Sequence, residues 1–358
     1  MVGARPQFVK AAVISRNIRS KFRHFEEIMV HTGQHFDENM SDIFFENLEI
    51  TKPKYFLNIN NLSHGAMIGK MIMELEKIFL KEKPSCIILY GDTNSTLAAG
   101  LAGKKLNIKI AHIEAGVRNY DESMPEESNR YLVDRLSDFN FCCTELGFSN
   151  LTAEGFNLEL MNKKFYLTGD VMYDAALFES ERKQSLSSIC QNIIQEKKDF
   201  VLATIHRPSN TDSEMSLSAI INDLNAINSI SRVIFLAHPR TKNKLSNFDI
   251  KPDFEIFEPL GYFDTIQLIK SSETVITDSG GLVREAYFFK TKSLFLLSNP
   301  VWPELIDANA CINICPSEGK IFENYNLLRS QKVYWDNKIF GDGCAGEEIL
   351  EILSKELS

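Results

Sequence analysis

Short apolar runs alternate with amphipathic stretches along almost the whole chain, and this order restricts the fold more than any other feature. The apolar runs lie at 86–90, 108–113, 139–143, 200–205, 232–237, 274–277 and 293–297. Helix-forming stretches such as "PEESNRYLVDRLS" and "EMSLSAIINDLNAINSI" separate them. Strands that alternate with helices form parallel sheets with helices on their faces. The sequence therefore predicts an α/β protein.

The length of the chain indicates two domains. A chain of 358 residues exceeds one ordinary hydrophobic core and suits two. The alternating order occurs once in each half, so we expect two doubly wound, Rossmann-like domains. Gly169 and Asp170 interrupt a strand pattern in the stretch 166–176, which places the join there.

Charge and cysteine content exclude several classes of protein. The net charge of −9 argues against nucleic acid or an anionic membrane surface as the main partner. Seven cysteines form an odd number without paired CxxC motifs, which favours a reducing cytoplasm and argues against a zinc site. No apolar stretch approaches the roughly 20 residues of a membrane span.

The glycine-containing turn "GARPQF" follows only two residues, although strands usually have about 5–6. Two explanations stay open: the start lies further upstream, or the chain tolerates a short central strand. No GxGxxG follows this strand and no GxxxxGK[ST] occurs, so neither NAD chemistry nor ATPase chemistry is expected.

Polar residues at the ends of parallel strands are the candidates for chemistry, because ligands bind at that edge. Asp92 and Glu114 follow neighbouring strands, so their carboxylates are expected in one crevice. "SMPE" matches a capping box with Ser123 as N-cap and Glu126 at N3, and capping explains Glu126 and Glu127 as well as catalysis does. Three further acids are predicted to be solvated: Asp121, Glu122 and Asp134.

The stretch "TDSGGLVREA" (277–286) predicts an anion site. A strand ends, glycines follow and a helix begins, so free N–H groups can receive a phosphate. The alternative is that Asp278 or Ser279 only caps the helix. Glu285 lies further along this helix, where it can reach a ribose diol. Taken by itself, it is expected to be an ordinary surface glutamate.

Cationic side chains can balance the charge of a diphosphate in this acidic protein. Arg5 and Lys10 open the first helix, and His206 and Arg207 follow a strand of the second half. Taken singly, Lys10 is expected to be a solvated helix residue. The segment with His31 and His35 is predicted to be a loop and lacks an HExxH pattern, so no metal is expected.

Several ordered motifs together resemble the non-hydrolysing UDP-N-acetylglucosamine 2-epimerases, within the branch acting in bacterial surface-polysaccharide pathways. The matching stretches are "GARPQFVKAA", "HTGQHFDENMSDIFFENLEI", "GDTNSTLAA", "HIEAGVRNYDESMPEESNR", "TIHRPSN", "HPRTKN", "EPLGYFD" and "TDSGGLVREA". Their order over nearly the whole chain is more specific than any one of them.

The resemblance implies a GT-B-like pair of Rossmann-like domains with the active site in the interdomain cleft. The N-terminal domain would comprise 1–169 plus a returning helix within 345–358, and the nucleotide-binding domain 170–344. It also implies a homodimer in the cytoplasm. A UDP-sugar effector at a second site would be a further partner.

The resemblance also assigns roles to residues. Catalytic roles fall on Asp92, Glu114, Glu126 and His206. Substrate-binding roles fall on Arg5, Lys10, Gln34, His35, Arg130, Arg207, His238, Ser279, Gly280, Gly281 and Glu285. Of these, Arg5, His206, Ser279 and Gly280 match diphosphate contacts, and Glu285 matches the ribose-binding carboxylate.

The implied reaction converts UDP-N-acetylglucosamine to UDP-N-acetylmannosamine without a cofactor. UDP is eliminated across C1–C2 to give a glycal and is added back after proton delivery to the opposite face. Three alternatives stay open: a hydrolysing epimerase, a related glycosyltransferase and a UDP-sugar-binding protein without turnover. Which acid acts on which sugar face is left open.

Overall fold

The protein divides into two α/β units, each described here by itself. The structure is a computed structural model that describes residues 1–34, 45, 50–158, 163–182, 184–196, 199–316, 319–335 and 338–358. Unit 1 comprises Met1–Ala175 and Lys338–Ser358, and unit 2 comprises Ala176–Asn337. The division after Ala175 falls inside the stretch 166–176. No helix among the described residues is long and apolar enough to cross a membrane.

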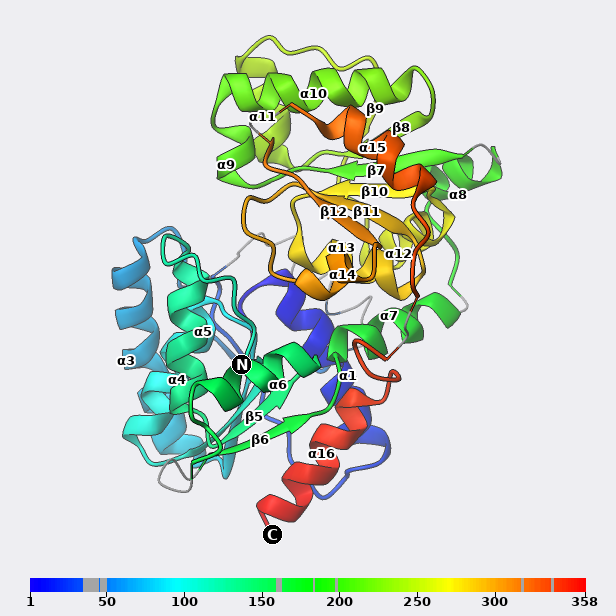
Figure 1. Ribbon diagram of the computed structural model, residues 1–358. Coiled ribbons are helices and arrows are strands. Elements are labelled where there is room, and N and C mark those ends of the chain that lie inside the picture. Colours follow the sequence, from blue (N-terminus) through cyan, green and yellow to red (C-terminus); the bar gives the residue numbers. More distant parts are fainter. Residues whose placement is uncertain are drawn as a thin grey trace. The chain divides into compact units, whose positions relative to one another are not determined.

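Unit 1 contains a four-stranded parallel sheet in the order β3-β4-β5-β6 (Figure 1). Its strands are β3 (Cys86–Tyr90), β4 (Lys109–Ala115), β5 (Phe139–Cys142) and β6 (Lys164–Leu167). The helices are α1 (Arg5–Ser20), α3 (His64–Glu82), α4 (Asn94–Lys105), α5 (Pro125–Leu136), α6 (Glu145–Ala153), α7 (Val171–Glu181, which runs into unit 2) and α16 (Ala345–Glu356). Strands and helices alternate as predicted.

Small residues allow α4 to pack closely on this sheet. Ala98 and Ala99 are fully buried, and a Cβ on Gly103 would lie 2.4 Å from the side chain of Ile87. The apolar side of α3, with Met71 and Leu75, joins the same core. This packing places the carboxyl ends of β3 and β4 beside the start of α4 and α5.

The amino-terminal residues form little strand. β1 (Val30–His31) and β2 (Tyr55–Phe56) make a separate two-stranded parallel sheet. Val2 joins it by one isolated bridge to His31, so the predicted first strand is reduced to a single bridge. His31 was predicted to lie in a loop, which is wrong, because it pairs with Phe56 and is fully buried.

Unit 2 contains a six-stranded parallel sheet in the order β12-β11-β10-β7-β8-β9. Its strands are β7 (Phe200–Thr204), β8 (Arg232–Leu236), β9 (Glu255–Phe257), β10 (Thr274–Thr277), β11 (Lys292–Phe295) and β12 (Cys311–Asn313). Its helices are α8 (Ser188–Gln195), α9 (Pro208–Thr211), α10 (Glu214–Asn228), α11 (Pro239–Asn247), α12 (Tyr262–Ser271), α13 (Gly280–Phe288), α14 (Pro303–Asp307) and α15 (Ile321–Ser330). The sheet's order reverses between β7 and β10, which is where ligands bind in such folds.

The last helix, α16, belongs to unit 1 and packs against α1. Asp174 binds the first turn of α16. The backbone N–H groups of Ala345 and Gly346 donate to its carboxylate at 3.1 and 2.7 Å. Tyr166 donates to Glu356 near the other end of α16 at 2.9 Å. Burial raises the pKa of Asp174 to about 7 despite the two donors.

We expect Asp174→Asn to change how stability depends on pH. Between about pH 4 and 7 the folded chain holds the Asp174 proton and the unfolded chain has released it. Rising pH therefore destabilises the wild type, relative to Asp174→Asn, by up to about 1.4 kcal/mol per pH unit. Above pH 7 the difference levels off. Urea unfolding at several pH values measures it.

Asp249→Asn is the matched control, because the Asp249 side chain is 85% exposed. Its free energy of unfolding should run parallel to that of the wild type above pH 5. A difference between the wild type and Asp174→Asn that stays constant from pH 4 to 7 would contradict the assignment.

Candidate functional site

Two acids meet at the carboxyl ends of the neighbouring strands β3 and β4. Gly91, with a φ of +60°, turns the chain after β3 and leads into Asp92. In β4 the register with β5 shifts between Ile113 and Ala115, and the residue between them, Glu114, has a φ of +77°. A Cβ on Gly91 would lie 3.4 Å from the Glu114 carboxylate, so this bulge brings Glu114 beside the residue before Asp92.

Lys10 of α1 pairs with Glu114. Their Nζ and Oε2 atoms are 2.6 Å apart, and the side chains are 3% and 11% exposed. The solvated position expected of Lys10 taken singly is therefore wrong. The ammonium lies 3.4 Å from the position of a Cβ on Gly91, so it also borders the turn before Asp92.

Arg130 of α5 joins Asp92 to a second acid, Glu127. Its Nη2 lies 2.6 Å from Asp92, and its Nη1 lies 2.7 Å from Glu127. The Asn129 amide donates to the backbone carbonyl of Asp92 at 2.8 Å. One turn of α5 therefore fixes the Asp92 loop through both its side chain and its backbone.

The predicted capping box at Ser123 and Glu126 is wrong. The residue before α5 is Met124, which makes no side-chain capping bond, and Ser123 donates to Asp121 instead. The Ser123 hydroxyl is therefore used within the loop and is not available to cap the helix. Glu126, in the first turn of α5, is half-buried.

Glu127, rather than Glu126, carries the structural role. It is 1% exposed and receives the backbone N–H groups of Asn119 and Tyr120 at 3.2 and 3.0 Å. Tyr120 has a φ of +56°, so this carboxylate holds an unusual turn. The structural role of this pair of acids therefore falls on Glu127 and not on Glu126.

Asp134 was predicted to be solvated, which is wrong. It is fully buried in α5, and His112 of β4 and Arg118 both lie 2.7 Å from its carboxylate oxygens. The charge pattern of α5 does not indicate that Asp134 is buried, because both of its partners lie outside this helix. The polar residues His112 and Asp134 were both absent from the predicted site.

Of the remaining predicted residues of unit 1, two are described. Arg5 is the first residue of α1 and is half-buried. Gln34 accepts hydrogen bonds from the backbone N–H and the hydroxyl of Ser95, at 3.0 and 2.7 Å. Gln34 therefore joins the segment after β1 to the start of α4. His35 lies outside the described residues.

Asp278, buried at the end of β10, organises the basic loop of unit 2. It receives the backbone N–H of Arg207 at 2.8 Å and the Asn210 amide at 3.0 Å. His206 Nδ1 lies 2.7 Å from the same carboxylate. Burial favours the protonated acid, but the hydrogen bond and charge of His206 outweigh it, so the pKa of Asp278 is lowered. Asp278, one of the two alternatives for the cap of α13, thus holds the basic loop, and Ser279 is the N-cap.

The start of α13 is capped by Ser279 and leaves its two glycines only partly covered. The Ser279 hydroxyl accepts from the backbone N–H of Leu282 at 3.3 Å, so Ser279 does cap the helix. Gly280 and Gly281 are half-buried, and a Cβ on Gly280 would come no closer than 3.6 Å to Trp302. Glu285, in the middle of the helix, is 4% exposed.

His238 is exposed at the N-terminus of α11. Its Nδ1 accepts from the backbone N–H of Arg240 at 3.2 Å, and its ring centroid lies 6.5 Å from that of His206. The two histidines and Arg207 thus lie at neighbouring strand ends, those of β7 and β8. Unit 2 therefore offers a group of donors suited to an anion.

Three side chains of unit 1 could approach a cation: Glu114, Cys143 and Asp170. Their ligand atoms lie within 4.8 Å of one another. The Lys10 ammonium already pairs with Glu114, so its charge competes with any metal ion there. We assign no metal to this group.

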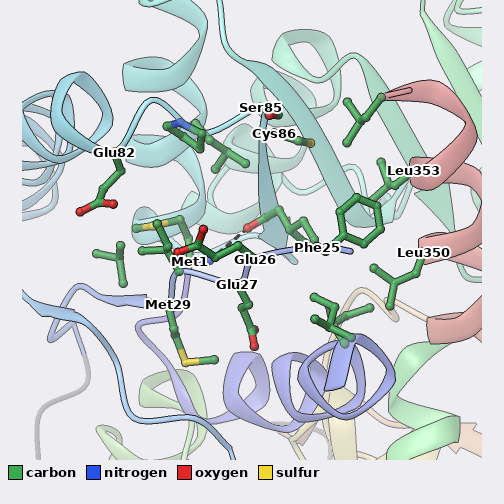
Figure 2. Close-up of a pocket in the computed structure, with 18 of the residues that line it drawn as sticks. Met1, Phe25, Glu26, Glu27, Met29, Glu82, Ser85, Cys86, Leu350 and Leu353 are labelled. Carbon is green, nitrogen blue, oxygen red and sulfur yellow. Dashed lines mark hydrogen bonds between the residues drawn. The ribbon is translucent and has the colours of Figure 1, made fainter. Parts of the chain in front are cut away.

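A cavity of about 580 Å³ lies elsewhere in unit 1. Figure 2 shows Leu350 and Leu353 of α16 pointing toward it, with Phe25 and Met29 from the chain before β1. The Met1 amino group donates to the Ile88 carbonyl at 3.1 Å, and burial lowers the pKa of this amine to about 6. None of the described lining residues belongs to the predicted site.

Comparisons with known proteins agree with the motifs. The family model described as UDP-N-acetylglucosamine 2-epimerase matches residues 18–354. A Pseudomonas aeruginosa protein named UDP-2,3-diacetamido-2,3-dideoxy-D-glucuronate 2-epimerase is 42% identical, over 99% of this chain and 98% of its own. A Methanococcus maripaludis UDP-N-acetylglucosamine 2-epimerase is 37% identical, over 99% and 98%.

A solved structure supports the fold class. The Methanocaldococcus jannaschii UDP-GlcNAc 2-epimerase, crystallised with UDP-GlcNAc and UDP, has a TM-score of 0.88 and 36% identity. The match covers 99% of this chain and 98% of that one. The predicted pair of Rossmann-like, GT-B-like domains is confirmed by this likeness and by the two parallel sheets.

We expect Arg130→Met to lower the free energy of unfolding by about 3–5 kcal/mol, because it leaves the buried Glu127 without its cation. Arg232→Met is the matched control: Arg232 also pairs with two acids, but these are 44% and 51% exposed. Exposed pairs contribute at most about 1 kcal/mol. Chemical denaturation of the three proteins measures both effects. Equal losses in the two variants would contradict the assigned role of Arg130.

Proposed function

Because the chain belongs to the UDP-N-acetylglucosamine 2-epimerase family, we propose that it inverts C2 of a UDP-2-acetamido sugar. The observation that carries this proposal is the pair of carboxylates at adjacent strand ends, Asp92 and Glu114, each beside a cation. Inversion at C2 needs a base on one face of the sugar and an acid on the other. Glu126, half-buried on the next helix, supplies a third carboxyl group.

In the proposed reaction UDP leaves across C1–C2 and returns after proton delivery to the opposite face. The C2 proton has no adjacent carbonyl to acidify it, so departure of the diphosphate must share the work. Arg207 and His206, both held by Asp278, and the N–H groups at the start of α13 would stabilise the departing charge. The cations of the unit 2 loop therefore act on UDP, and the acids of unit 1 act on the sugar.

The sugar itself has two candidates. UDP-N-acetylglucosamine is named for most of the relatives, and we propose it as the substrate. A UDP-2,3-diacetamido-2,3-dideoxy-glucuronate is the second candidate, because a 42% identical relative carries that name whereas the 37% and 36% identical relatives carry the other. The two share the C2 acetamido group and differ at C3 and C6.

Finer assignments complete the proposal. We place the enzyme in the cytoplasm, as a homodimer that serves a bacterial surface-polysaccharide pathway and binds a UDP-sugar effector at a second site. Its chemistry uses no cofactor. Light scattering during size-exclusion chromatography measures the oligomeric state, and a mass of one chain of 40.7 kDa would contradict the dimer.

Proton NMR in D₂O tests the reaction. Incubation with UDP-N-acetylglucosamine should give UDP-N-acetylmannosamine with deuterium at C2 and no accumulation of free sugar. The same experiment with UDP-2,3-diacetamido-2,3-dideoxy-glucuronate tests the second candidate. Free sugar with UDP would instead indicate a hydrolysing enzyme. Ligand-induced stabilisation without exchange for either sugar would indicate a binding protein.

We expect Asp92→Asn, Glu114→Gln and Glu126→Gln each to lower kcat by about 10²–10⁴-fold, since each removes one positioned acid or base. Glu122→Gln is the matched control, because Glu122 is an exposed acid in the same loop. Its kcat should stay within about twofold of the wild type. Steady-state rates with the preferred sugar measure the effect. Full activity of Glu114→Gln would exclude Glu114 as a proton-transfer group.

A further inference from the structure

His112 makes two hydrogen bonds to oxygen atoms of other segments. Its Nδ1 lies 2.7 Å from an Asp134 carboxylate oxygen, and its Nε2 lies 2.8 Å from the backbone carbonyl of Gly91. A carbonyl can only accept, so Nε2 donates to it. The fully buried ring therefore links α5 to the turn after β3.

Asp134 extends this network from α5. Its second oxygen receives the backbone N–H of Gly116 at 3.1 Å and lies 2.7 Å from Arg118 Nη2. Burial opposes ionisation, but the hydrogen bonds and charges of His112 and Arg118 outweigh it, so the pKa of Asp134 is lowered. Glu154 accepts from Arg118 Nε at 2.7 Å. Arg118 therefore joins two acids, Asp134 and Glu154.

The two ends of this network are the backbone segments that carry the acids. The Gly91 carbonyl belongs to the residue before Asp92, and the Gly116 N–H lies two residues after Glu114. Both segments have left-handed conformations: Gly91 has a φ of +60°, and Glu114 and Gly116 each have +77°. Such conformations persist where the surrounding structure holds them.

Close packing behind Gly116 shows how fully this segment is determined. A Cβ there would lie 2.1 Å from the Gly147 carbonyl oxygen, so the turn fits against the start of α6 without space for a side chain. Asp134 holds it from the other direction through its N–H. The bulge that carries Glu114 therefore has a fixed end.

We propose that His112 and Asp134 form a buried positioning pair that sets Asp92 and Glu114 in register with each other. His112 contacts the Asp92 turn, Asp134 contacts the Glu114 bulge, and the bond between them makes the two segments one unit. The effect of this pair on turnover rests on the proposed function, whereas the coupling of the two backbone segments does not. Neither residue touches the substrate in this role.

Two variants of His112 that differ by one methylene test the proposal. In His112→Gln (H112Q) the side-chain amide is long enough to donate to the Gly91 carbonyl. In His112→Asn (H112N) the amide can present an N–H to Asp134 but is too short to reach Gly91. Leu75→Ala, a change of a fully buried side chain in α3 that makes no hydrogen bond to the network, controls for general destabilisation.

Amide hydrogen exchange is the first readout, and it needs no substrate. In H112N, the amides of residues 91–93 should exchange at least about tenfold faster than in the wild type, while H112Q keeps most of the protection. Leu75→Ala should leave this segment unchanged relative to its neighbours. Equal protection of residues 91–93 in H112N and the wild type would overturn the proposal, whatever the enzyme's activity.

Turnover is the second readout. A displacement of about 1 Å can cost about 10²-fold in rate. We expect kcat to fall about 10²-fold in H112N with KM within about threefold. In H112Q, which keeps the Gly91 contact and gives up the bond to Asp134, kcat should fall by an intermediate factor of about tenfold. A fall of kcat in Leu75→Ala as large as in H112N would overturn the positioning role. If the wild type turns over neither sugar, the proposed function fails, and hydrogen exchange alone decides this proposal.

Discussion

The pairing of each strand-end acid with a cation from a neighbouring helix is the interaction on which the unit 1 site depends. Asp92 and Glu114 follow neighbouring strands, and two bare carboxylates so placed would repel each other. Lys10 neutralises Glu114 from α1, and Arg130 neutralises Asp92 from α5. The two cations come from different helices, so the packing of α1 and α5 on the sheet decides whether both acids can be brought together.

Unit 2 uses the opposite arrangement. There a single buried anion, Asp278, gathers His206, the backbone of Arg207 and Asn210. Because Asp278 is buried, water does not screen its carboxylate, and its hydrogen bonds fix the orientation of the loop's donors. The Asp278 carboxylate thus orients cationic side chains that can bind a second anion, the diphosphate of the proposed ligand.

Local patterns in the sequence predicted most elements because hydrophobic period and strand length are local properties. β3, β4 and β5 and the helices between them lie where the apolar runs and amphipathic stretches placed them. Errors arose where a partner distant in the chain competes with a local one. Ser123 donates to Asp121 and does not cap α5. Asp134 is buried because it pairs with His112 and Arg118, which lie in other elements.

The sequence by itself determined the fold class, the strand ends and the chemical types available at them, because each of these depends on neighbours in the chain. It also supplied Asp92, Glu114 and Glu126 as candidates. Only the tertiary structure decided which charges meet: Lys10 with Glu114, Arg130 with Asp92 and Glu127, and His112 with Asp134. The physical reason is that ion pairs and buried hydrogen bonds depend on distances of about 3 Å between side chains, and only the packing of helices on the sheet sets such distances across tens of residues.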